Sequence, residues 1–384
     1  SGRKIWSSLI EAKVGNVELS AEQIESYLDL AKELGINAVI TISNQFATVP
    51  THHPVAINKQ KLRSVELYHF SWLSLLTKAT LLAQSKTVDD PEQAFLLREL
   101  IRFLNHSSSG VCDFTRMCGD WKEIATRIQT GTPIPRGFEP AISAASDWQQ
   151  LVRFLGLELS TAIGKPVSVS LTRAHEKDPA KRLQDDVMQL STLHTLSADF
   201  SIPNAASNVT IEADFLRRSL RFSVGLNTPE DRARPAAALT WVLRQLPALV
   251  EATDTLVRVH WTGRAADTVA TLAEANTDSK AVVPEGKKEL PTGFQIQRVV
   301  DLAARFKGPS TFVEDVRKEL PRFYKDVVQN LSRWVPRPPK LKGSGSPSEA
   351  AEEEIEKDVE AIRDRLEEQS EVVERVNGSE SQAP

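Results

Sequence analysis

The chain has 384 residues, of which 41% are hydrophobic and 26% are charged, with 21 Pro and 17 Gly. This is the composition of an ordinary globular protein, and it excludes collagen-like, wholly disordered and disulfide-framework proteins. Because the length exceeds the roughly 100–200 residues of a common single domain, we expect two folded domains with extensions.

Cysteine content and hydropathy bear on the cellular compartment. The two cysteines, Cys112 and Cys118, cannot provide the four ligands of a structural zinc site. One disulfide between them could not stabilise a chain of this length, so the cysteine content favours a reducing compartment. No apolar run reaches the roughly 18 residues that span a bilayer, and no charged-then-apolar leader opens the chain. We therefore expect a cytoplasmic protein with no membrane partner. Because the sequence begins Ser1-Gly2 without Met, we interpret it as a fragment or processed form with sequence missing upstream.

The first regular elements form a strand, helix, strand pattern over residues 5–14, 20–34 and 37–43. Ser20 followed by Gln23 fits a capping box, and Gly35 stands where a helix ends in left-handed geometry. Apolar residues at helical spacing give the helix a buried face; they are Ile24, Leu28, Ala31 and Leu34. Two strands joined by such a helix form a parallel crossover, so the N-terminal region is predicted to be α/β.

The remaining elements alternate between helix and strand. Helices are expected over 65–84, 91–104, 121–128, 148–159 and 235–246, and strands over 167–171, 209–224 and 256–261. The Pro- and Gly-rich stretch 130–137 is predicted to separate two domains. The predicted organisation is an α/β domain with appended helices over 1–130, an α+β domain of unknown role over 141–334, and a linker and tail over 335–384.

The C-terminal tail is acidic. From Glu349 onward 13 acidic and 4 basic residues give a net charge of −9, so a total of −4 leaves the body at +5. A mildly basic body is compatible with a polyanionic partner such as nucleic acid. The heptad-like apolar spacing over 355–376 has three interpretations: a coiled-coil helix for self-association or a partner helix, a disordered acidic solubiliser, or a segment that folds over the basic body.

The chemically informative motif is Glu11-Ala12-Lys13 on the first expected strand. Alternation along a strand places Glu11 and Lys13 on the same face, where a carboxylate and an ammonium share one small surface. A carboxylate can hold a hard divalent cation beside a phosphodiester, and the lysine can steer the attacking water and offset developing charge. By itself the triplet is also typical of two solvent-facing neighbours on a strand. Gln23 and Tyr27 lie four residues apart on the next helix, and so on one helical face.

These motifs resemble the PD-(D/E)XK nuclease superfamily, in particular its RecB-like branch with a Q-x-x-x-Y helix. The resemblance covers about the first 45 residues and implies a restriction-endonuclease-like α/β fold and a metal-dependent nuclease that hydrolyses DNA. It implies that Glu11 and the carbonyl of Ala12 bind Mg²⁺ or Mn²⁺, that Lys13 serves the attacking water, and that Gln23 and Tyr27 support the site. Two local roles remain open: Gln23 as part of the capping box, and Tyr27 as an aromatic that packs at the edge of the core.

The superfamily pattern also has an Asp on the strand before E-x-K, whereas residues 1–10 contain no acidic residue. Either that Asp lies upstream, or another acid replaces it in space, or the site is inactive. We expect the first alternative, with poor metal binding by the chain as given. An inactive nuclease-like scaffold, or an interaction protein that uses its acidic C-terminal helix, is the alternative function.

Other candidate residues have weaker patterns. His52 and His53 are interpreted either as phosphate or metal contacts or as loop surface, and the two cysteines as buried small hydrophobes. The cluster Arg217, Arg218 and Arg221 fits either phosphate contacts or a solvated sheet edge. The sequence contains no Walker loop, dinucleotide glycine fingerprint or G-x-S-x-G elbow. It therefore gives no support for a nucleotide-driven motor or a triad hydrolase.

Overall fold

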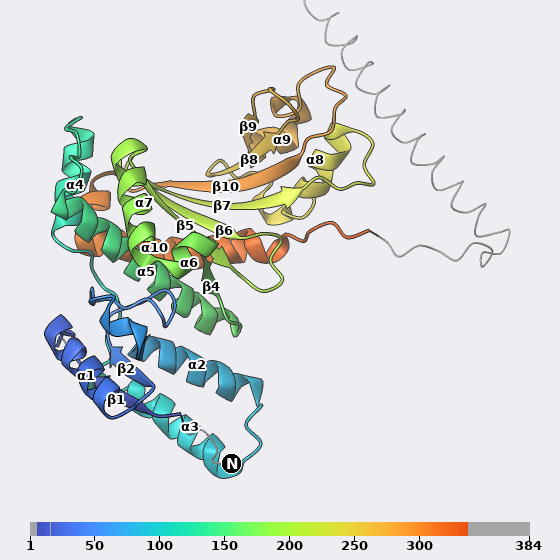
Figure 1. Cartoon of the computed structure of the whole chain (residues 1–384). Coiled ribbons are helices and arrows are strands. Elements are labelled where there is room, and N and C mark those ends of the chain that lie inside the picture. The colour runs from blue at the N-terminus through green and yellow to red at the C-terminus, as the bar shows by residue number, and fades with distance from the viewer. Residues whose placement is uncertain (1–5, 16, 337–384) are drawn as a thin grey trace, which may run out of the picture. The chain divides into compact units, whose positions relative to one another are not determined.

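Two β-sheets of different kinds organise the computed structural model, which describes residues 6–15 and 17–336 (Figure 1). Within these residues, one sheet has three parallel strands in the order β1-β2-β3, and the other has seven antiparallel strands in the order β4-β5-β6-β7-β10-β8-β9. The protein is therefore a mixed α/β structure. The predicted tail over 355–376 lies outside the described residues. Within the described part, no helix is long and apolar enough to cross a membrane.

The N-terminal elements build the parallel sheet and the helices around it. They are β1 (Ser8–Ala12), α1 (Ala21–Glu33), β2 (Ala38–Ser43), β3 (Glu66–Ser71), α2 (Trp72–Ser85) and α3 (Pro91–Leu104). The next helix, α4 (Asp120–Gln129), contributes its buried residues to the large apolar core instead. The predicted strand, helix, strand start of the chain is confirmed, and β1 pairs with β2 in parallel. The predicted helices at 91–104 and 121–128 are confirmed as α3 and α4.

Helix α1 follows its sequence signals closely. Ser20 is the N-cap, Gly35 has φ +65° just beyond the C-cap, and Ile24 and Leu28 are buried. Leu34, predicted to share that buried face, is instead 64% exposed, because it is the C-cap residue at the end of the last turn.

The prediction of a single helix over 65–84 was wrong at its start. Residues Glu66–Ser71 form β3, which pairs in parallel with β2, and helix α2 begins only at Trp72. The segment contains Val65, Tyr68 and Phe70, residue types that favour a strand, and β2 offers a free edge for pairing. Ser71 then caps α2 by accepting a hydrogen bond from the backbone N–H of Ser74 at 3.1 Å.

The remaining elements build the antiparallel sheet and its covering helices. They are α5 (Glu139–Ile163), β4 (Ser168–Ser170), α6 (Arg173–Lys177), α7 (Pro179–Thr192), β5 (Thr195–Ser201), β6 (Val209–Asp214), β7 (Ser219–Asn227), α8 (Pro235–Leu243), β8 (Thr255–His260), β9 (Thr268–Thr271), α9 (Leu272–Thr277), β10 (Gly293–Asp301) and α10 (Pro309–Asp326). The predicted strand over 209–224 is a hairpin of β6 and β7, whose turn holds Arg218 at φ +57°. Elements at 148–159, 167–171, 235–246 and 256–261 were correct in type.

One large apolar core lies between the antiparallel sheet and the helices α5 and α10, which run along one face of the sheet in Figure 1. The rings of Phe222 on β7 and Phe323 on α10 stack with centroids 5.8 Å apart. Phe46, from the loop after β2, enters this core and packs against Phe154 of α5 at 5.6 Å. The carboxyl end of the parallel sheet is therefore anchored to the large core.

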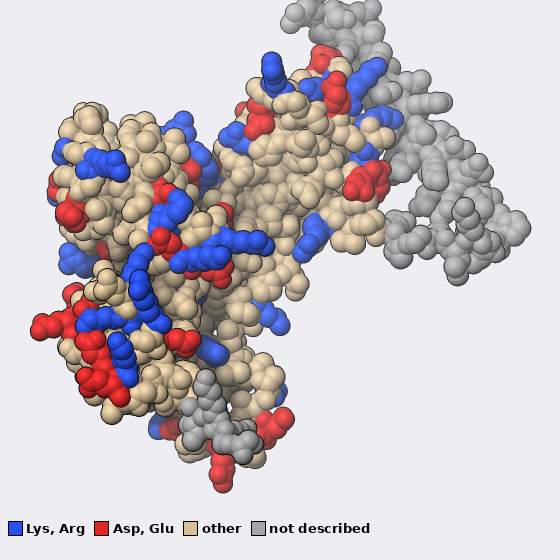
Figure 2. Space-filling view, in the orientation of Figure 1, with Lys and Arg blue, Asp and Glu red and all other residues tan. Residues whose placement is uncertain are grey.

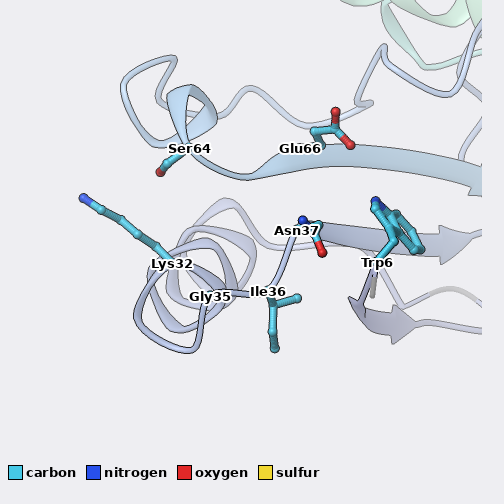
Figure 3. A pocket seen from close by; sticks show the side chains of 7 residues that line it. All are labelled: Trp6, Lys32, Gly35, Ile36, Asn37, Ser64 and Glu66. Carbon is cyan, nitrogen blue, oxygen red and sulfur yellow. The ribbon is translucent and has the colours of Figure 1, made fainter. Parts of the chain in front are cut away.

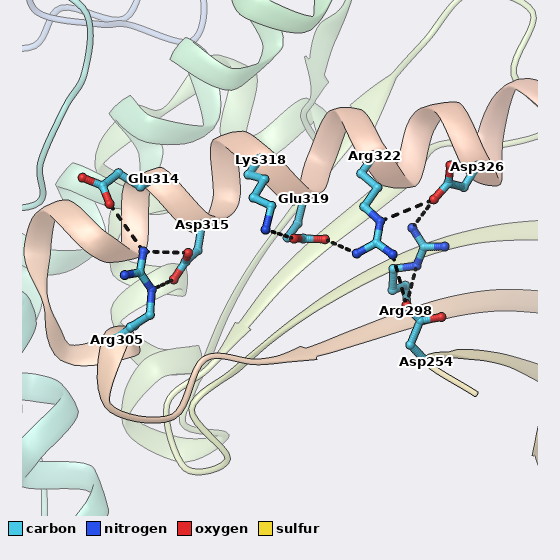
Figure 4. A network of polar contacts seen from close by, with 9 residues as sticks. All are labelled: Asp254, Arg298, Arg305, Glu314, Asp315, Lys318, Glu319, Arg322 and Asp326. Atoms are coloured by element: carbon cyan, nitrogen blue, oxygen red, sulfur yellow. Dashed lines mark hydrogen bonds and ion pairs between the residues drawn. The ribbon is translucent and has the colours of Figure 1, made fainter. Parts of the chain in front are cut away.

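Ion pairs fasten α10 to β10, an inner strand of the antiparallel sheet (Figure 4). Arg298 on β10 is 1% exposed and donates to Asp326 at the end of α10 at 2.9 Å and to the Thr255 hydroxyl at 3.2 Å. Such partners are needed because a buried guanidinium without them carries a large desolvation cost.

Helix α1 and the parallel sheet share a small second core, which makes Leu28 critical for the part of the fold that carries the E-x-K motif. We expect Leu28→Ala to lower the free energy of unfolding by about 2–5 kcal/mol, because Leu28 is 1% exposed and its loss leaves a cavity. Urea unfolding measures the change. Leu30→Ala on the same helix is the control, since Leu30 is 41% exposed, and a loss equal to that of Leu28→Ala would contradict this packing.

Candidate functional site

The carboxyl end of β1 presents Glu11 and Lys13 toward α1. Parallel pairing sets Glu11 opposite Thr41 of β2, and the backbone N–H of Lys13 donates to the carbonyl of Ile42 at 2.8 Å. Lys13 Nζ lies 2.6 Å from Glu11 Oε1, and the two side chains are 22% and 16% exposed. The ion pair is therefore partly shielded from water, unlike the two solvent-facing neighbours that the triplet alone also allowed.

Gln23 and Tyr27 complete a four-residue cluster with this ion pair. Gln23 Nε2 donates to Glu11 Oε1 at 3.1 Å and to the Tyr27 hydroxyl at 3.1 Å. Both N–H bonds of the amide are thus used, which fixes its orientation. The Gln23 backbone N–H donates to the hydroxyl of the N-cap Ser20 at 3.5 Å, but the Gln23 side chain turns to Glu11 instead of closing the capping box. The structure brings all four sequence-predicted side chains together.

Glu11 is held as a carboxylate by this cluster. The hydrogen bond from Lys13 is the main reason that the pKa of Glu11 is lowered, and Tyr27 and Gln23 act in the same direction. Partial burial opposes these partners by raising the pKa. A group with a depressed pKa contributes stability above pH 4.5, and this contribution is lost as the pH falls through the folded value.

Hard-cation ligation at this site is limited by the number of donors. The Glu11 carboxylate is a suitable oxygen ligand, and the carbonyl of Ala12 faces the open edge of β1, because Lys13 directs its own N–H to β2 and successive residues alternate. Within the described residues no group of three or more His, Cys, Asp or Glu could hold a metal ion. The donors fit Mg²⁺ in kind, with water and a substrate phosphate left to complete the coordination shell.

A buried relay of two histidines lies beside Glu11 in the same row of the sheet. Thr41, the β2 partner of Glu11, is paired in register with His69 of β3. His69 Nε2 donates to the carbonyl of Gln45 at 2.9 Å, so in neutral His69 the Nδ1 atom accepts from the Thr41 hydroxyl at 2.9 Å. Thr41 Oγ1 then accepts from His53 Nε2 at 2.9 Å, and His53 Nδ1 accepts from the backbone N–H of Val55 at 3.1 Å rather than donating to the Val55 carbonyl, 3.2 Å away. This single direction assigns a neutral tautomer to each ring.

His69 was missed because residue 69 was assigned to a helix rather than to β3. The sequence signal that could have found it is the strand alternation of β3, which places His69 on the α1 side with Leu67. His52 does not join the relay: it is buried, and its Nε2 donates to the carbonyl of Glu176 at the end of α6 at 2.7 Å. It fastens the loop after β2 to the rest of the chain.

The arginine cluster is divided between a strand and a turn. Arg221 on β7 pairs with Glu212 of β6 at 2.9 Å. The sheet-edge interpretation is wrong for Arg221, because β7 lies inside the sheet between β6 and β10. Arg217 and Arg218 lie in the exposed turn between β6 and β7, and their interpretation as phosphate contacts stays a prediction.

Cys112 is exposed rather than buried, because it lies in the irregular chain after α3, and Cys118 is partly buried, with its pKa raised to about 11 mainly by burial. Neither cysteine forms a disulfide.

A cavity of about 390 Å³ lies at the opposite end of the parallel sheet (Figure 3). Trp6 precedes β1, Asn37 precedes β2 and Glu66 begins β3, so these side chains line the amino ends of the strands. Ligands of parallel sheets bind beyond the carboxyl ends of the strands. The cavity is therefore separate from the cluster around Glu11.

Comparison of the chain with protein-family models, with curated proteins and with solved structures finds no match.

Replacing the lysine tests the electrostatics of the cluster. We expect Lys13→Met to raise the pKa of Glu11, because the main hydrogen bond to the carboxylate is removed. Carbon-detected NMR titration of the Glu11 carboxyl measures the shift. Lys32→Met, at the C-terminal end of α1, keeps the cluster intact and should leave the titration unchanged; an unchanged titration in Lys13→Met would contradict the geometry.

The histidine relay predicts a pH-dependent stability. Burial lowers the pKa of His53 from 6.5 to about 4, and the pKa of His69 is also lowered by burial. Because the unfolded chain binds the His53 proton at higher pH, stability should fall as the pH drops from about 6.5 to about 4, by at most about 3 kcal/mol for His53. Urea unfolding at several pH values compares wild type with His53→Gln, which should have the smaller slope; equal slopes would oppose this assignment.

Proposed function

We propose that the parallel-sheet part of the chain is a PD-(D/E)XK-like nuclease module of restriction-endonuclease-like fold, which acts on phosphodiester bonds of DNA. The observation that carries the proposal is the hydrogen-bonded cluster of Glu11, Lys13, Gln23 and Tyr27. The order β1, α1, β2 with parallel pairing agrees with the resemblance in the first 45 residues.

Each residue of the cluster has a distinct role in this proposal. Glu11, kept ionised by its partners, and the carbonyl of Ala12 would hold Mg²⁺ or Mn²⁺. When bound, such an ion polarises the phosphate and acidifies water. The ammonium of Lys13 orients the attacking water and donates to the phosphate oxygens as negative charge develops on them. The side-chain amide of Gln23 holds the Glu11 carboxylate in position, and the Tyr27 hydroxyl accepts a second hydrogen bond from that amide.

Nucleic acid would reach this site without a broad basic surface on the face drawn in Figure 2. On that face Lys and Arg side chains are interspersed with Asp and Glu, including the region around α1. Pairs such as Lys61 with Asp29, at 2.7 Å, account for part of this mixing. Affinity would therefore depend on a few placed cations rather than on a high positive potential.

A second candidate function is a nuclease-like scaffold that binds nucleic acid without cleaving it. The observation that favours it is the single carboxylate: Lys13 already occupies Glu11 Oε1, and the described residues supply no cluster of three metal-binding side chains. Binding without hydrolysis by the wild-type chain would support this alternative.

Cleavage of DNA tests the proposal directly. We expect wild type to hydrolyse DNA only at high concentrations of Mg²⁺ or Mn²⁺, because the described residues offer few ligands to the ion. We expect Glu11→Gln and Lys13→Met each to lower the rate by about 10²-fold or more, because each removes charge at the reacting phosphate. Gel assays of labelled single- and double-stranded DNA measure the rates. Lys32→Met is the control for loss of one lysine.

The outcomes separate the two functions. Equal rates in wild type, Glu11→Gln and Lys13→Met would refute the nuclease assignment and indicate a contaminating activity. No cleavage by any of them, together with DNA binding by wild type, would establish the scaffold function instead.

A further inference from the structure

Arg153 on α5 is a partly buried arginine without a partner among residues 6–15 and 17–336. Its Nε is shielded from solvent and unpaired, and no hydrogen bond or ion pair to a described residue engages its guanidinium. The desolvation of Arg153 lowers its pKa with no opposing contribution from a carboxylate. An uncompensated guanidinium of this kind is costly to keep in a fold.

Other shielded arginines of the described chain show how such a charge is normally satisfied. Arg298 pairs with Asp326 (Figure 4), Arg317 donates to Glu158 at 2.5 Å, and Arg182 donates to the hydroxyl of Thr48. Each has an oxygen atom from the protein. Arg153 has none within the part of the chain that the structure describes, so we take its guanidinium as available for an anion.

The position of Arg153 connects it with the loop after β2. Gln149 and Gln150 are its neighbours on the helix surface at i−4 and i−3. Gln150 Oε1 accepts from the backbone N–H of Phe46 at 3.3 Å, and Gln149 donates to Asp186 of α7 at 2.6 Å. Arg153 therefore lies on the side of α5 that meets both this loop and α7.

The same loop starts at the candidate site. Ile42 accepts the backbone N–H of Lys13, and Asn44 donates to the carbonyl of Gly15 at 2.9 Å. From Ile42 to Phe46 the chain advances four residues, which is at most about 14 Å. Phe46, which Gln150 holds one helical turn before Arg153, therefore lies within a span that a few nucleotides of a strand bound at Lys13 would cover.

We propose that Arg153 binds a backbone phosphate of the nucleic acid whose neighbouring phosphodiester lies at Glu11 and Lys13. This rests on the proposed function for the identity of the ligand. A planar guanidinium presents paired N–H donors to phosphate oxygens, and the contact has no dependence on base sequence.

Binding measurements in EDTA test the assignment without cleavage. Fluorescence anisotropy of a labelled 12-nucleotide DNA strand compares full-length wild type, Arg153→Gln, Arg153→Lys and Arg98→Gln, the last an exposed arginine on α3. We expect Arg153→Gln to weaken binding about tenfold for every sequence and to lower the salt slope by about 1, Arg153→Lys to restore part of the affinity, and Arg98→Gln to resemble wild type.

Thermal unfolding without ligand distinguishes phosphate binding from a structural role. Arg153→Gln should be at least as stable as wild type, because it removes an unpaired charge. A lower melting temperature together with weaker binding would overturn the proposal, as would affinity and salt slope equal to those of Arg98→Gln. Stabilisation of wild type by inorganic phosphate, with DNA binding unaffected by Arg153→Gln, would overturn the assignment to nucleic acid.

The binding and cleavage experiments distinguish failure of the Arg153 proposal from failure of the nuclease assignment. If Glu11→Gln cleaves like wild type while Arg153→Gln binds DNA less well, the nuclease function fails and the phosphate contact stands. If wild type binds no DNA, the Arg153 proposal fails as well.

Discussion

Parallel pairing between β1 and β2 is the constraint on which the candidate site depends. Side chains of a strand alternate between faces, so the register that sets Glu11 opposite Thr41 also turns Lys13 toward α1 and leaves Ile10 on the other face. A slip of one residue would move the acid and the amine away from Gln23. The ion pair, the amide of Gln23 and the histidine relay beside Thr41 all use this one register.

The carboxyl edge of the parallel sheet is held from two sides. Phe46 inserts into the large core against α5, and His52 donates to the end of α6. Between them, Thr41, His53 and His69 form a chain of hydrogen bonds whose polar atoms are satisfied without charge. A buried polar network of this kind fixes one arrangement, because any rotated ring would leave donors facing donors. The loop after β2 is thereby fixed next to Glu11.

The electrostatics of the molecule differ between its two sheets. In the antiparallel part, charges such as Arg298 are balanced by acids on α10, which is the arrangement expected of structural ion pairs. At the parallel sheet, Glu11 is balanced by Lys13 and has two neutral partners, whereas Arg153 on α5 has no counter-charge among the described residues. A guanidinium without a counter-charge suits a phosphate ligand, and this links the two proposals.

Local signals in the sequence determined the start of the fold and the members of the cluster. The cap at Ser20, the glycine after α1 and the E-x-K alternation each act over fewer than five residues, so they can be interpreted without knowledge of distant contacts. Tertiary structure alone decided the rest. It made β3 a strand by offering the edge of β2, brought His69 and Thr41 together across the sheet, and turned the Gln23 side chain from its cap to Glu11. It also left Arg153 without a partner among the residues that the structure describes. These outcomes depend on pairing and burial between residues far apart in sequence, and no local pattern specifies them.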